Sequence, residues 1–122
     1  MGTHPINLAL RFLLELAALV AAGAWAWRQG EGWSRYLWAI GLPLLLAAAW
    51  GTFAVPDDPS RSGAAPVPVS GILRLALELA FFAFGSWALY ASGYSRLGWL
   101  FGILVVGHYA LSYDRILWLL KQ

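Results

Sequence analysis

The stretch Arg11-Phe12-Leu13-Leu14-Glu15-Leu16-Ala17 lies near the start of one apolar run, and Arg74-Leu75-Ala76-Leu77-Glu78-Leu79-Ala80 lies near the start of another. A second pair follows at nearly the same offset, because Ser34-Arg35-x-x-Trp38-x-x-Gly41 recurs as Ser95-Arg96-x-x-Trp99-x-x-Gly102. Two such pairs predict a chain made of two repeats. Charged residues are costly inside apolar segments, so their presence at matching positions marks the best candidate for a site.

The composition indicates which solvent surrounds the chain. Of its 122 residues, 61% are hydrophobic and only 11% are charged, and a water-soluble domain of this size could hardly cover so much apolar surface. Only helices and closed barrels satisfy every backbone group in lipid. We therefore expect an all-α integral membrane protein, a bundle of four transmembrane helices in two repeated hairpins. The four runs long enough to cross about 30 Å of hydrocarbon are roughly 5–28, 36–55, 71–91 and 97–120.

The connections between these runs predict how the helices are paired. The first and third connections are short, so the helices that they join should be antiparallel neighbours. The middle connection is longer and holds four of the six prolines. We expect a single transmembrane domain over 1–122, with a first hairpin at about 5–55, a Pro-rich connection at 56–69 and a second hairpin at about 70–120.

Aromatic residues gather near the two short connections, as they do at membrane–water interfaces. That end of the bundle is therefore expected to lie at headgroup level. The residues are Trp25, Trp27, Trp33, Tyr36, Trp38, Trp87, Tyr90, Tyr94 and Trp99.

Polar residues should meet at the opposite end. The first and third runs point in the same direction, so their first thirds lie at one membrane face, which the middle connection and the end of the fourth run also reach. A ligand-binding cluster is expected there, and it could bind a small molecule or a lipid. Its candidate residues are Asn7, Arg11, Glu15, Arg61, Arg74, Glu78, His108, Tyr109, Tyr113, Asp114 and Arg115.

The spacing of the charges leaves their pairing open. Arginine and glutamate are four residues apart in both repeats, which allows ion pairs within a helix or between the repeats. The similarity of the two repeats favours the crossed pairs. His108 lies about two helical turns before Arg115, near the expected depth of Glu15 and Glu78. It could be an interior histidine hydrogen-bonded to a glutamate or a reactive group.

Catalytic and metal-binding motifs are missing from the sequence. It has no cysteine, which excludes disulfides, thiolate nucleophiles and cysteine metal sites, and no nucleophile elbow, Walker loop or dinucleotide fingerprint. His108, Glu15 and Glu78 are the candidates for acid–base catalysis. The same three could offer ligands to a metal, but no carboxylate–histidine spacing supports this, so we predict no metal and assign no cofactor.

Three polar strings resemble the YrdB family of small bacterial membrane proteins, and the likeness extends over almost the whole chain. That family is similar in length and is thought to have four spans. The resemblance thus implies the same fold, in the bacterial inner membrane, and names no substrate. The strings are His4-Pro5-x-Asn7-x-x-x-Arg11-Phe12-x-x-Glu15, Asp58-Pro59-Ser60-Arg61-Ser62-Gly63 and His108-Tyr109-x-x-Ser112-Tyr113-Asp114-Arg115.

The basic residues favour one orientation in the membrane. The end with both termini holds five and the opposite end three, which favours cytoplasmic termini. They form no dense cluster, so we expect no nucleic-acid partner. The five are Arg11, Arg61, Arg74, Arg115 and Lys121, and the three are Arg28, Arg35 and Arg96.

Three functions are compatible with these residues. In the first, a small transporter or channel-like protein attracts a polar or anionic solute with its arginines while Glu15, Glu78 and His108 relay protons. Four helices leave little room for a pathway, so this hypothesis implies a homo-oligomer. In the second, a membrane-embedded enzyme uses those three groups on a lipid-soluble substrate. In the third, the protein is structural or accessory, and its Arg/Glu pairs only lock the bundle.

Overall fold

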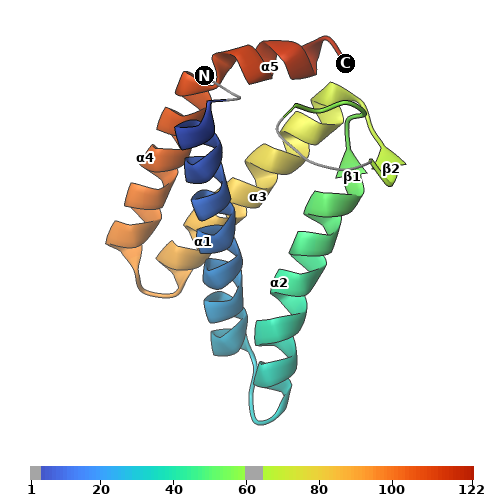
Figure 1. Cartoon of the computed structure of the whole chain (residues 1–122). Helices are drawn as coiled ribbons and strands as arrows, with labels where there is room; N and C mark the ends of the chain where they lie inside the picture. Colours follow the sequence, from blue (N-terminus) through green and yellow to red (C-terminus); the bar gives the residue numbers. More distant parts are fainter. Residues whose placement is uncertain (1–3, 60–64) are drawn as a thin grey trace.

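The protein is described by a computed structural model over residues 4–59 and 65–122, and it is helical, as the sequence predicts (Figure 1). Two short segments on either side of the middle connection pair in parallel, Phe53 with Val67 and Ala54 with Pro68. The elements are α1 (Pro5–Gln29), α2 (Ser34–Thr52), β1 (Phe53–Ala54), β2 (Val67–Pro68), α3 (Gly71–Ala91), α4 (Ser95–Leu111) and α5 (Tyr113–Leu120).

Two helices, α1 and α3, are each long and apolar enough to cross a membrane, which indicates a membrane protein. A third candidate is the pair α4 and α5, which meet at an angle of 70°. Among the described residues the candidate spans thus number two or three. The span expected at 36–55 corresponds to α2, which is not one of them, and the count of four stays a prediction.

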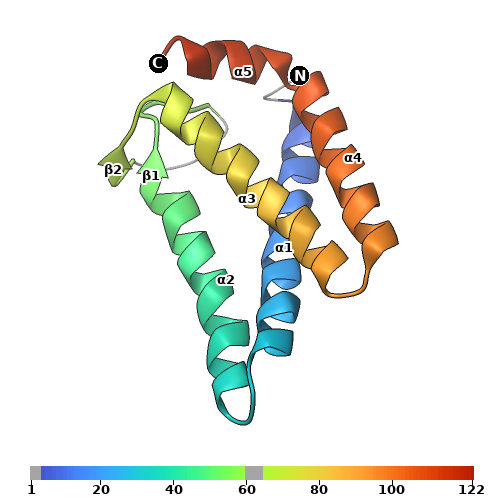
Figure 2. The same ribbon diagram turned by 180° about the vertical axis from the view of Figure 1, so that it is seen from behind.

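The predicted run 97–120 is not one straight helix. The helix breaks at Ser112, whose amide donates to the carbonyls of both His108 and Tyr109 at 2.9 and 3.2 Å. Such shared bonding tightens the last turn of a helix. The chain then turns, and α5 crosses one end of the molecule from the end of α4 to the start of α3 (Figures 1 and 2).

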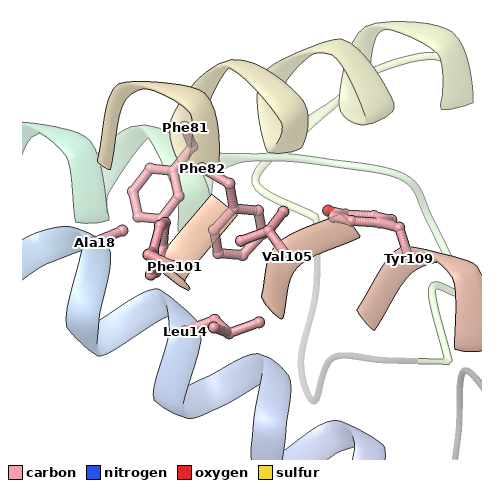
Figure 3. Packing of buried hydrophobic residues seen from close by; sticks show 7 residues of the cluster. All are labelled: Leu14, Ala18, Phe81, Phe82, Phe101, Val105 and Tyr109. Carbon is pink, nitrogen blue, oxygen red and sulfur yellow. The ribbon is translucent and has the colours of Figure 1, made fainter. Parts of the chain in front are cut away.

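Helix α3 is central and packs against both α1 and α4, whereas α2 packs mainly against α1 (Figure 2). No residue of α2 is buried. The apolar core therefore forms between α1, α3 and α4. On α1 and α4 its buried side chains are four residues apart, as on one helix face, whereas α3 contributes two adjacent phenylalanines. The members of the core, shown in Figure 3, are Leu14, Ala18, Phe81, Phe82, Phe101, Val105 and Tyr109.

A glycine lets α5 lie against the start of α3. A Cβ atom on Gly71 would overlap the carbonyl group of Leu119. We expect Gly71→Ala to displace α5 and to lower the free energy of unfolding by about 1–3 kcal/mol, the usual cost of overpacking. Thermal unfolding in detergent would measure this, with Gly41→Ala as the control because nothing lies within 4 Å of its Cβ position. Equal melting temperatures for the two variants would contradict the prediction.

Candidate functional site

One fully buried carboxylate, that of Glu78 in α3, binds three arginines from three helices. Its Oε2 atom lies 2.8 Å from Nε of Arg74 and 2.6 Å from Nη2 of Arg115. Its Oε1 atom lies 3.1 Å from Nη2 of Arg11 and accepts a hydrogen bond of 2.8 Å from the Tyr109 hydroxyl. Glu78 thus connects α1, α3, α4 and α5 at one point.

A second buried carboxylate comes from the middle connection. Arg115 binds Asp58 with both terminal nitrogens, at 2.6 and 3.0 Å, the two-pronged geometry in which arginine pairs best with a carboxylate. The turn before Asp58 has proline at its second position and a left-handed residue, Asp57 (φ 62°), at its third. The Asp58 amide closes the turn on the carbonyl of Val55 at 3.3 Å.

Helix α2 joins the cluster through its last turn. Nη1 of Arg74 donates to the carbonyls of Trp50 and Phe53 at 2.6 and 2.7 Å, which lack partners within the helix. The indole of Trp50 also lies beneath two guanidinium groups, 5.0 Å from that of Arg11 and 4.4 Å from that of Arg74. Cation–π contacts of this kind are strongest away from water.

The charges in this cluster balance. Three arginines, Arg11, Arg74 and Arg115, face three carboxylates, because Glu15 also lies 3.4 Å from Nε of Arg11. Both pairings that the spacing allows are present: Arg11 and Arg74 each contact the glutamate of their own helix, and Arg11 also crosses to Glu78. A buried charge is tolerated only when it is paired, and the cluster meets this condition.

Beside the ionic cluster, α1 and α4 share a chain of neutral polar groups. The Asn7 amide donates to Oγ of Ser112 at 2.5 Å, and its carbonyl oxygen lies 2.9 Å from Nδ1 of His108. The histidine's partner is thus Asn7, not the glutamate that the sequence interpretation allowed. Because the Asn7 oxygen only accepts, Nδ1 carries hydrogen, and Nε2 of a neutral ring is an acceptor.

Two side-chain atoms near this chain of polar groups are buried without a hydrogen-bond partner. Nη1 of Arg11 and Nε2 of His108 make no hydrogen bond to the described part of the chain. The two residues are 5% and 2% exposed. Unsatisfied buried polar atoms are rare and costly, so these two atoms are the parts of the cluster that still lack a hydrogen-bond partner.

Tyr109 offers a direct check on the cluster. We expect Tyr109→Phe to lower the free energy of unfolding by about 1.5–3 kcal/mol, since it removes a hydrogen bond to a charged group and leaves the ring in place. Tyr113→Phe is the matched control, because Tyr113 is 64% exposed. Chemical denaturation in detergent would compare the two, and an equal loss of stability would show that the hydroxyl bond contributes little.

The structure brings seven of the eleven candidates into the buried network and leaves Glu15 half-buried at its edge. Tyr113 and Asp114 lie on the exposed side of α5, and Arg61 falls outside the described residues. Within residues 4–59 and 65–122, no group of three or more acidic or histidine side chains is placed so that it could hold a metal ion. Asp58, Ser112 and Trp50 were missed as site residues, although the first two lie in the strings that carry the family resemblance. The seven candidates that do lie in the buried network are Asn7, Arg11, Arg74, Glu78, His108, Tyr109 and Arg115.

Comparisons with known proteins agree with the resemblance found in the sequence. The chain is 44% identical over 119 residues to a protein of Bacillus subtilis (strain 168) described as "Uncharacterized protein YrdB", and the match covers 98% of this chain and 97% of the relative. No solved structure matches. Residues 9–106 match the family described as "Protein of unknown function (DUF2568)", so the chain belongs to that family.

Proposed function

We propose that this protein binds a small polar or anionic solute at the membrane-embedded cluster, between Arg11 and His108. The observation that carries the proposal is the pair of buried, unpartnered atoms, Nη1 of Arg11 and Nε2 of His108. The other charged groups of the cluster are paired, so these two atoms have the most to gain from a ligand.

The chemistry of the two atoms defines the solute. Nη1 of Arg11 is a donor and Nε2 of neutral His108 is an acceptor, so a neutral ligand needs both an acceptor oxygen and a hydroxyl or acid proton. An anion would suit the site once His108 had taken up a proton, because both atoms would then donate. Binding of an anion would thus carry one proton with it, which is the form that proton coupling would take here.

Native mass spectrometry of protein purified in mild detergent tests this proposal. We expect wild type to retain a small mass that His108→Ala loses, while Val20→Ala, a change at a 71% exposed position of α1 outside both the cluster and the aromatic end, retains it. Thermal unfolding of each variant would show that it is folded. Wild type without any retained mass, or equal retention by His108→Ala, would count against binding at this site.

A second function is favoured by the balance of charges. Three arginines and three carboxylates pair across three helices and the middle connection, as a structural lock requires. If locking is the only role, shape-matched neutral replacements keep the fold and lose no activity. Folded protein that retains no ligand would favour the lock over solute binding.

We infer that the membrane arrangement is the four-span bundle of two hairpins in the bacterial inner membrane, with cytoplasmic termini. Helix α2 is about 28 Å long at 1.5 Å per residue, close to the thickness of the hydrocarbon core. Its unburied apolar surface would face lipid or a second copy of the chain, as expected for a homo-oligomeric transporter. Since the chain has no cysteine, single cysteines at Gly32 and Gln122 would report the side of each end by thiol labelling. Labelling of both from one side would contradict this arrangement.

A further inference from the structure

Away from the polar cluster, α3 and α4 enclose an apolar groove of about 610 Å³. This volume lies within the range of small-molecule sites, about 300–1,000 Å³. The hydroxyl of Ser86, on the wall of the groove, already donates to the carbonyl of Gly98 at 2.7 Å. The walls include Leu79, Phe82, Ala83, Trp87, Trp99 and Val106.

Small residues on both helices form the floor of the groove. A Cβ atom on Gly98 would lie 2.9 Å from the Ser86 carbonyl oxygen, and one on Gly102 would lie 3.2 Å from its hydroxyl. The helices are therefore close here because the side chains are small. Trp87 and Trp99, whose rings are much larger, line the same groove.

The groove has the length of one bilayer leaflet. On α3 it extends from Tyr90, at the short connection, to Leu79, which is about 16 Å at 1.5 Å per residue. That is about half of the 30 Å hydrocarbon core. Its mouth is lined by Trp87, Tyr90 and Trp99, each at least half exposed, the residue types that lie at headgroup level.

The cross-section of the groove is too small for a helix. Its volume over that length corresponds to a mean cross-section of about 38 Å², whereas a helix about 10 Å in diameter needs about 80 Å². A hydrocarbon chain fits within the groove, whereas a helix of a second copy would have to lie partly outside it.

Positive charge gathers at the end of the molecule where the groove opens. Arg96 lies one helical turn before Trp99 on α4, and Arg28 lies over the ring of Tyr94 at 5.7 Å. With Arg35, the end of the molecule at the two short connections holds three arginines and one acidic residue, Glu31. Basic residues at the membrane surface attract anionic headgroups.

We propose that this groove binds an acyl chain of an anionic phospholipid, with its phosphate held at the mouth by Arg96 and Arg28. This groove is separate from the proposed solute site between Arg11 and His108, so the two proposals can fail independently. The bound lipid would fill a hollow that the chain itself leaves open and would hold α3 against α4 in one leaflet.

Native mass spectrometry with added lipid tests the site. Wild type in mild detergent would be mixed with phosphatidylglycerol or with phosphatidylcholine of the same chain length. We expect one retained phosphatidylglycerol, preferred over phosphatidylcholine by about fivefold for each arginine involved. Arg96→Gln should reduce that preference by about fivefold. Equal retention of the two lipids by wild type would overturn the assignment of the headgroup.

Variants that fill the groove test the acyl chain. Ala83→Leu places a larger side chain on the groove wall, and Ala80→Leu places the same side chain on α3 outside it. Gly102→Leu and Gly107→Leu form a second pair on α4, since nothing lies within 4 Å of the Gly107 Cβ position. We expect the first member of each pair to lose the bound lipid and the second to keep it. Equal lipid retention within both pairs would overturn the proposal.

Discussion

Replacement of Glu78 by glutamine should lower the free energy of unfolding by about 3–5 kcal/mol, the usual cost of removing one partner from a buried ion pair. Glu78 is the only carboxylate in the described residues that contacts Arg11, Arg74 and Arg115 together. The variant would keep the shape of the side chain and lose its charge. Three guanidinium groups would then share two carboxylates in a site closed to water, with one positive charge uncompensated.

Thermal unfolding in detergent, followed by circular dichroism, would measure this loss. Glu15→Gln is the matched control, because the Glu15 side chain is 21% exposed and its salt bridge with Arg11 is long, at 3.4 Å. Its cost should stay below about 1 kcal/mol, as for exposed pairs. Similar melting temperatures for the two variants would mean that Glu78 is not the centre of the cluster.

Those same charges were the part of the site that the sequence predicted best. A charge within an apolar run needs a reason to be there, and this argument alone identified Arg11, Glu15, Arg74 and Glu78. Placing them at one end of the molecule required only antiparallel hairpins. Six of the seven candidates in the buried network come from helices whose direction the connections determine, and the seventh, Arg115, comes from α5, which turns away from α4.

The missed residues lacked such a signal. Asp58 lies in a segment of prolines and aspartates that is typical of an exposed turn, and only the tertiary structure shows that the turn directs it toward Arg115. Trp50 lies at the end of an aromatic-rich helix, where anchoring in the interface is the ordinary explanation. The break at Ser112 was hidden because the apolar residues from Ile116 to Leu120 continue the run beyond the short polar stretch that follows Ser112. Pairing of His108 with Asn7 depends on side-chain geometry that periodicity does not contain.

The second large effect is expected where the middle connection meets α5. Asp58→Leu should cost about 3–5 kcal/mol, because it leaves Arg115 buried with half of its carboxylate partners. Arg115 is 5% exposed, as is Asp58, so water cannot reach the Arg115 guanidinium to replace the lost carboxylate. The loss of this ion pair should loosen α5 from the start of α3. Digestion by trypsin, which cleaves after lysine and arginine, would then be faster after Arg115 or Lys121.

Adding Arg115→Met to Asp58→Leu should restore most of the lost stability. The double change removes one positive and one negative charge together, so Glu78 keeps Arg11 and Arg74 and the cluster stays neutral. A buried ion pair replaced by apolar groups of similar volume is often no less stable than the original.

A double-mutant cycle, with each single variant measured in the same detergent, would give the coupling between the two residues, expected at about 1–3 kcal/mol. Additive losses would mean that the pair does not act as a unit. A stable double variant that still retains the solute at Arg11 and His108 would separate the lock from the binding site, because only the lock depends on Asp58.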